Sequence, residues 1–221
     1  MATGKIQRIA TSVGALTIAT LIGGTISLAS NVLMAKFFGA GHLTDAFFMA
    51  YAIPLLFAKV FQAGPMPKVF LSLFVREVET QERESAWRAA SNIFNVFAVF
   101  FVAIVGLLVL CAPWLVGVLA AGYESATFAE TVTLARVVIP VLGLLTLSAL
   151  LTAALQSLDE FVRPALFSLA LPSTFLVAIV LGYYTGMGII ALPLGLLAGN
   201  VIQLGGLYWC LAHKGFRHAW V

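Results

Sequence analysis

Three charged side chains lie within or beside long apolar stretches of the sequence, where a charge is costly and therefore informative. Lys59 lies fourteen residues after Asp45 in one apolar stretch, and Arg136 borders another apolar stretch. Ionisable groups inside a bilayer usually mark substrate or ion pathways. A lysine or arginine that faces a polar cavity can bind a phosphate group. We therefore take Asp45, Lys59 and Arg136 as candidate substrate-binding residues.

Each of the three also has a simpler structural role. The four-carbon stem of Lys59 lets its ammonium group reach the headgroup layer, and Arg136 can do the same at the end of its own segment. Asp45 follows Thr44 at the start of a predicted helix. There a hydroxyl caps free N–H groups and a carboxylate complements the positive helix end. The sequence leaves both roles open for all three residues.

The remaining reactive side chains do not form a catalytic or metal-binding arrangement. His42, His213 and His218 lie at segment ends or in the tail, and none has a nucleophile and a carboxylate at a credible spacing. Cys111 and Cys210 are the only cysteines, too few for a disulfide framework or a zinc site. We therefore predict that the chain is not an enzyme, and we predict no cofactor.

The composition excludes an ordinary water-soluble fold. Of the 221 residues 62% are hydrophobic and only 10% are charged, whereas a typical soluble domain has roughly 25% charged residues. The apolar residues form long runs rather than periodic stripes, which assigns them to contact with membrane lipid. The net charge is +3 without a basic patch of interleaved aromatics, so no nucleic-acid partner is expected. The predicted fold class is an all-α integral membrane protein.

Six apolar segments reach the length of roughly 20 residues that is needed to cross the hydrocarbon layer. We expect one transmembrane domain over 1–221, with a polar cytoplasmic loop at 65–88. The six predicted membrane-spanning helices cover approximately residues 9–35, 45–63, 89–119, 130–156, 164–184 and 188–212.

The distribution of basic residues predicts the orientation in the membrane. One side of the predicted bundle collects most of the lysines and arginines, whereas the other has only Lys36 and Arg136. Cytoplasmic loops are enriched in Lys and Arg, so both termini are predicted to be cytoplasmic. The basic residues assigned to the cytoplasmic side are Lys5, Arg8, Lys68, Arg76, Arg83, Arg88, Arg163, Lys214 and Arg217.

Small residues predict where two of the helices pack closely. In the first segment a small or polar residue recurs at every fourth position, and Gly195 and Gly199 repeat the spacing in the sixth. Small side chains let helix backbones approach in lipid, so both rows are predicted to face neighbouring helices. The row in the first segment includes Ala15, Ala19, Gly23, Ser27 and Asn31.

Prolines predict bends in five of the six segments. A proline inside a helix removes one backbone hydrogen bond and frees a carbonyl group. The five are Pro54, Pro113, Pro140, Pro172 and Pro193.

One stretch of the sequence resembles a known family. The string Phe38-Gly39-Ala40-Gly41-His42-Leu43-Thr44-Asp45-Ala46-Phe47-Phe48 is similar to the first interhelical signature of the MurJ/MviN lipid II flippases. Ala112-Pro113-Trp114 resembles the end of the third helix of that family, and Arg163-Pro164-Ala165 resembles a motif that comes later in the family's sequence. The order and spacing of these motifs follow the family over nearly the whole chain.

The resemblance implies a member of the multidrug/oligosaccharidyl-lipid/polysaccharide (MOP) exporter superfamily. Such proteins have about fourteen helices in two lobes, and a cationic cavity between the lobes takes the head group of an undecaprenyl-linked precursor by alternating access. Six helices correspond to the N-terminal lobe alone. The resemblance therefore implies a bacterial cytoplasmic (inner) membrane protein in peptidoglycan biosynthesis, which works as a homodimer or with a second-lobe or complex subunit.

The chain departs from the family at cationic positions. Gly24, Ser30 and Ala58 stand where the family has arginines, so that Lys59 and Arg136 are the cations that remain. Two alternatives to the flippase lobe therefore stay open. One is a non-transporting membrane scaffold subunit derived from such a lobe, and the other is a transporter of a less anionic substrate.

Overall fold

The computed structural model describes residues 2–63, 83–120 and 122–213. Within these ranges the regular elements are helices, and no strand occurs. In chain order they are α1 (Ala2–Phe38), α2 (His42–Ala63), α4 (Arg83–Leu110), α5 (Ala112–Leu119), α6 (Ser125–Val138), α7 (Val141–Ser157), α8 (Val162–Ser168), α9 (Ala170–Tyr184), the short 3₁₀ helix η1 (Gly188–Ile190) and α10 (Ala191–His213).

The helices confirm the predicted all-α membrane fold. Among the described residues five helical stretches are long and apolar enough to cross a membrane, and a sixth consists of two pieces that meet at a bend of 65°. The predicted loop at 65–88 lies mostly outside the described residues, and from Arg83 onward the chain is helical. The six stretches are Gly14–Phe38, His42–Phe61, Phe94–Leu110 with Ala112–Leu119, Ser125–Ser157, Val162–Tyr184 and Gly188–His213.

Prolines account for the sharpest interruptions. The 65° bend lies between α4 and α5, directly before Pro113. Proline cannot donate the hydrogen bond that would continue the helix, and its ring clashes with the carbonyl one turn earlier. Pro140 separates α6 from α7 in the same way. Pro54, in contrast, lies inside α2 without dividing it.

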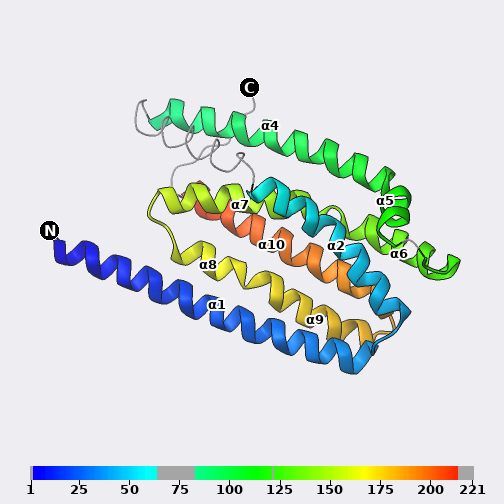
Figure 1. Ribbon diagram of the computed structural model, residues 1–221. Coiled ribbons are helices and arrows are strands. Elements are labelled where there is room, and N and C mark those ends of the chain that lie inside the picture. Colours follow the sequence, from blue (N-terminus) through cyan, green and yellow to red (C-terminus); the bar gives the residue numbers. More distant parts are fainter. Residues whose placement is uncertain (1, 64–82, 121, 214–221) are drawn as a thin grey trace.

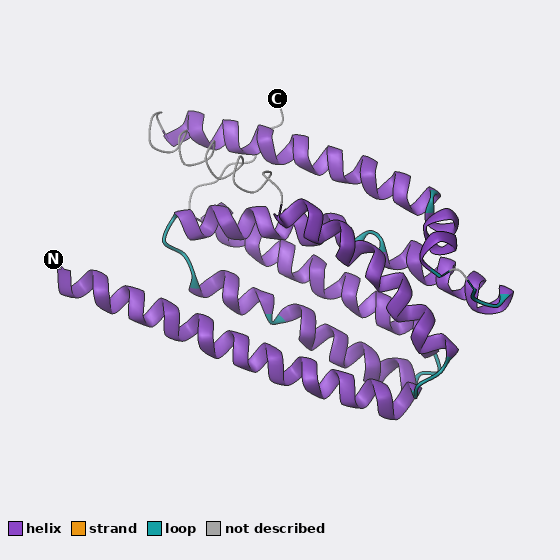
Figure 2. Cartoon of the chain, in the orientation of Figure 1, coloured by secondary structure: helices purple, strands orange, loops and turns teal. Residues whose placement is uncertain are grey.

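The helices pack as a bundle, and the helix at each edge has neighbours on one side only (Figures 1 and 2). α1 lies along α8 and α9 at one edge, and α4 lies along α7 at the opposite edge. Between these edges α10 packs against both α9 and α7, while α2 packs against α6 and α7. The arrangement leaves much of α1, α2 and α4 exposed.

The largest buried cluster joins α2, α6, α7 and α10. Phe47, Ile53, Ile139, Leu142 and Leu192 are fully buried in it. A second cluster joins the later halves of α7 and α10. Large apolar side chains also cover the outside, as lipid contact requires.

Candidate functional site

The signature string forms the tight turn between α1 and α2. α1 ends at Phe38, and Gly39 follows with a φ of +70°, in the left-handed region that favours glycine. The N–H of Gly39 donates to the carbonyl of Ala35 at 3.1 Å. The hydroxyl of Thr44 donates to the carbonyl of Gly39 at 2.9 Å, which ties the first turn of α2 to the end of α1.

The predicted capping role of Thr44 is wrong, because α2 begins at His42 rather than at residue 45. Thr44 therefore lies inside the first turn, and its hydroxyl serves the carbonyl of Gly39 instead of a free N–H. Asp45 is also in the first turn, with an exposed side chain and its N–H donating to the carbonyl of Gly41 at 3.0 Å. A carboxylate at that place complements the positive end of the helix dipole.

The aromatic residues of the signature separate a buried face of α2 from an exposed one. Phe47 is buried, and its ring stacks with Tyr51 and Phe175, at centroid distances of 6.0 Å and 6.1 Å. The next residue, Phe48, is 52% exposed. The buried ring fixes the rotation of α2, and Asp45 is thereby turned outward.

Asp45 and Lys59 belong to one exposed strip along α2, which we call the α2 strip and define as Asp45, Phe48, Leu56 and Lys59. Fourteen residues at 3.6 per turn bring the two charged side chains within about 40° of the same face, about 21 Å apart along the axis. Lys59 has no ion-pair partner among the residues that the structure describes.

Arg136 is also exposed, but the structure does not bring it to Lys59. The Nε2 atom of His42, the first residue of α2, lies 3.9 Å from Oε2 of Glu130, the sixth residue of α6, so these two residues lie at about the same level. Both helices then run in the same direction (Figure 1), and α2 packs against α7 as well as against α6. At 1.5 Å per residue, Arg136 lies about 9 Å below that level and Lys59 about 26 Å below it. Asp45, Arg136 and Lys59 thus lie at three depths.

Glu130 is a charged residue that sequence reasoning missed. Its Oε2 atom is buried without a hydrogen-bond partner. The residue lines a pocket of about 330 Å³ together with Leu43, Thr133 and Ile189. Glu130 and His42 are far apart in the sequence, and no local pattern joins them. Only the packing of α2 against α6 shows that they meet.

The positions where the resemblance expects arginines differ in their surroundings. Ser30 is 1% exposed and its hydroxyl donates to the carbonyl of Ile26 at 2.8 Å, and Ala58 is 4% exposed. Gly24 on α1 is exposed, with open space where a Cβ would lie. Small side chains at Ser30 and Ala58 therefore fill interior positions of this bundle, whereas Gly24 lies on its surface.

The small residues of α1 lie toward α8 and α9. Ala19 is buried and Ala15 is half-buried. A Cβ added at Gly23 would lie 3.3 Å from Cδ2 of Leu169. Ser27 and Asn31, which continue the predicted row, are exposed.

The glycines of α10 lie directly against α9. A Cβ at Gly195 would overlap the side chain of Ala178 and lie 3.1 Å from the carbonyl of Thr174. At Gly199 it would lie 2.9 Å from Cα of Leu171. The two backbones approach as closely as they do because neither glycine has a side chain.

Comparison with known proteins gives one consistent family. The sequence model of the family described as "Lipid II flippase MurJ" matches residues 34–220. A probable lipid II flippase MurJ of Rhizobium meliloti is 27% identical over 213 residues, which cover 93% of this chain and 39% of the relative. A protein of the same description from Rhizobium tropici is 31% identical, with 91% of this chain and 38% of the relative covered.

A solved structure agrees with these relatives. The structure described as lipid II flippase MurJ in an inward closed conformation aligns with a TM-score of 0.75 at 25% identity, and the alignment covers 90% of this chain and 42% of that one. The chain thus spans about 40% of the length of the relatives that it matches.

Proposed function

Because this chain belongs to the MurJ family of lipid II flippases, we propose that it forms one lobe of a flippase. Its substrate would be an undecaprenyl-linked peptidoglycan or glycan precursor, moved across the bacterial cytoplasmic membrane by alternating access. The observation that carries this proposal is the family match over residues 34–220, and the structural match supports it. Transport in such proteins needs two lobes that move against each other around a site near the middle of the membrane.

The α2 strip is the wall that we assign to the substrate path. α2 exposes Asp45 and Lys59 along one face of a membrane-spanning helix. An uncompensated cation in such a segment is costly unless it meets a polar cavity, the headgroup layer or an anion. With both termini on the cytoplasmic side, Lys59 lies toward the cytoplasm and Asp45 toward the outside.

The spacing along the path supports a sequence of contacts rather than one closed phosphate site. Lys59 offers a single flexible cation, which binds a phosphate as a point charge rather than through a fixed fork of donors. Arg136 lies nearer the outer end, on α6. A pyrophosphate head group would therefore meet Lys59 first when it enters from the cytoplasm, and Arg136 later.

The opposite wall must come from another polypeptide segment. We propose that a second lobe, supplied by a second copy of this chain or by another subunit, faces the α2 strip. The exposure of Asp45, Phe48, Leu56 and Lys59 along α2 supports this arrangement, since it leaves one face of that helix without a neighbour among the described residues.

Binding of an undecaprenyl pyrophosphate lipid tests the role of Lys59. The assay uses the chain in lipid nanodiscs, and compares the wild type with Lys59→Ala, Lys59→Arg and the control Arg163→Ala, which removes another exposed cation. We expect Lys59→Ala to abolish binding, while Lys59→Arg and Arg163→Ala retain it. Unchanged binding by Lys59→Ala would return this residue to a role in the headgroup layer.

The mass of the native complex tests the second lobe. Extraction from the membrane should yield either a dimer or a complex with another chain. A complex with several subunits that binds no pyrophosphate lipid would instead favour the non-transporting scaffold.

A further inference from the structure

The long helix α4 is followed by a short helix that turns away from it. α5 (Ala112–Leu119) meets α4 at a bend of 65° and lies beside α6 (Figure 1). After a turn of 65°, a helix advances only about 0.6 Å per residue along the previous axis, against about 1.5 Å in a continued helix. α5 therefore adds little to the reach of α4 across the membrane.

α4 does not need α5 in order to cross the membrane. The part of α4 from Ala89 to Leu110 contains no charged residue and is about 33 Å long at 1.5 Å per residue. The hydrocarbon layer of a bilayer is about 30 Å thick. α4 alone can thus reach from one headgroup layer to the other, and α5 begins where that crossing ends.

Contacts of α5 and α6 place α5 at a surface of the membrane. A Cβ added at Gly117 would lie 3.9 Å from Cε2 of Phe128 on α6. Two residues later, Oε2 of Glu130 lies 3.9 Å from Nε2 of His42, where the membrane-spanning stretch of α2 begins. The exposed residue Glu124 follows α5 in the chain. α5 therefore lies near the depth at which α2 leaves the hydrocarbon layer.

The two faces of α5 have different surroundings. Ala112 and Val116 are fully buried, in the same cluster as Phe47 of α2. Trp114 and Val118 lie four residues apart on the opposite face and are 69% and 61% exposed. Tryptophan has a large apolar body and one N–H donor, and it is enriched at the boundary between lipid headgroups and acyl chains. The exposed face of α5 is thus suited to that boundary.

We propose that α5 is an interfacial helix whose exposed face binds the bilayer at the boundary between phospholipid headgroups and acyl chains. Trp114 and Val118 contact the first carbons of the acyl chains, and the indole N–H of Trp114 donates to a lipid oxygen. The bilayer is the partner because α5 lies at that depth, and because α5 has no charged side chain that water would solvate. This contact is separate from the α2 strip and does not depend on transport.

The depth of nitroxide labels along α5 tests the proposal. The intact chain, with Cys111→Ala and Cys210→Ala as background, carries a single label at Trp114→Cys or at Val118→Cys. It is reconstituted in phosphatidylcholine liposomes. The accessibility of each label to oxygen, compared with its accessibility to a water-soluble nickel chelate, gives the depth of the label in the bilayer.

We expect both α5 labels to lie about 15 Å from the bilayer centre, which is half the thickness of the hydrocarbon layer. Their depths should differ by only about 2–3 Å, because α5 advances slowly along the direction of α4. Ala103→Cys and Leu107→Cys form the matched control, since both positions are exposed on α4 and have the same spacing of four residues. Labels there should differ in depth by about 6 Å.

If Trp114→Cys does not fold, the native tryptophan reports its own depth. Replacing Trp87, Trp209 and Trp220 by Phe leaves Trp114 as the single tryptophan of the chain. Lipids brominated near the headgroup end of the acyl chain should then quench its fluorescence more than lipids brominated near the end of the chain.

Three results would overturn the proposal. A depth difference of about 6 Å between the α5 labels would show that α5 continues the crossing. Labels as accessible to the nickel chelate as a label at Glu124→Cys would place α5 in water. Stronger quenching of Trp114 by lipids brominated near the chain end would place it deep in the hydrocarbon layer. None of these results bears on pyrophosphate binding at Lys59.

Discussion

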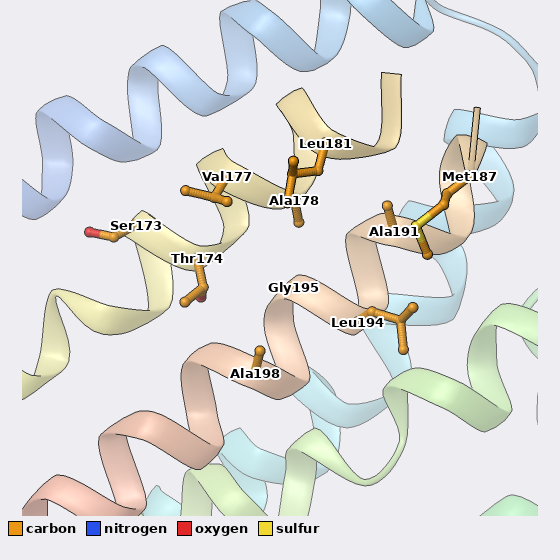
Figure 3. Close-up of a pocket in the computed structure, with 10 residues that line it drawn as sticks. All are labelled: Ser173, Thr174, Val177, Ala178, Leu181, Met187, Ala191, Leu194, Gly195 and Ala198. Carbon is orange, nitrogen blue, oxygen red and sulfur yellow. The ribbon is translucent and has the colours of Figure 1, made fainter. Parts of the chain in front are cut away.

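Gly195 on α10 lies so close to Ala178 on α9 that a Cβ added to the glycine would overlap the alanine side chain. The contact sets the distance between two membrane-spanning helices, and both residues line an apolar pocket between these helices (Figure 3). Small residues at such contacts replace the hydrophobic driving force that soluble helices have, because lipid is as apolar as the helix surface.

Gly195→Ala should destabilise the bundle by about 1–3 kcal/mol, because overpacking forces the two helices apart. Gly205→Ala is the matched control, since a Cβ there meets no atom within 4 Å. Alanine is intrinsically the better helix former, so the control should be neutral or slightly stabilising. Thermal unfolding in detergent measures both. Equal midpoints for the two variants would contradict the close approach of α9 and α10.

Gly23→Leu should weaken the packing of α1 on α8 and α9 by a few kcal/mol. A Cβ at Gly23 would already lie 3.3 Å from Leu169, whereas the neighbouring Gly24 has open space. Gly24→Leu should therefore leave the unfolding midpoint nearly unchanged. The comparison is sharp because the two positions are adjacent on one helix. A midpoint that falls equally in both variants would show that α1 packs through a wider face.

Thr44→Val should cost about 0.5–1.5 kcal/mol, because it removes the hydroxyl that donates to the carbonyl of Gly39. Thr25→Val removes a hydroxyl of the same kind that donates within α1, at an exposed site, and should cost less. Proteolysis of the α1–α2 turn, followed over time in detergent, gives a local readout besides the melting midpoint. A turn that is equally protected in both variants would deny Thr44 this role.

If the chain is one lobe of a flippase, as proposed, the purified chain reconstituted alone in proteoliposomes should not flip lipid II, because one lobe would supply only one wall of the path. Robust flipping by a demonstrated monomer would refute the need for a second lobe.

Gly24→Arg should be tolerated and should strengthen binding of a pyrophosphate lipid if exposed α1 also lines the path. Ala58→Arg should instead unfold the protein, since an unpaired buried charge costs several kcal/mol.

The membrane fold could be read from the sequence because it depends on length and composition. An apolar run must satisfy its own backbone hydrogen bonds in lipid, so each run had to be a helix of about the predicted extent. Pro113 likewise determined a break in the third span. The three residues by which α2 starts early were not predictable, since the turn is set by Gly39 and by a hydrogen bond back to it.

The relations between helices were decided only by the tertiary structure. A repeat of four residues drifts by about 40° per step around a helix of 3.6 residues per turn. The predicted row on α1 therefore leaves the contact after Gly23: Ser27 and Asn31 are exposed, and Ser30 and Met34 are buried instead. In the same way, nothing in the sequence placed Glu130 beside His42 or set Arg136 at a different depth from Lys59. Charge and hydropathy are properties of single residues and could be read directly, whereas depth and facing depend on how two helices are rotated and shifted against each other.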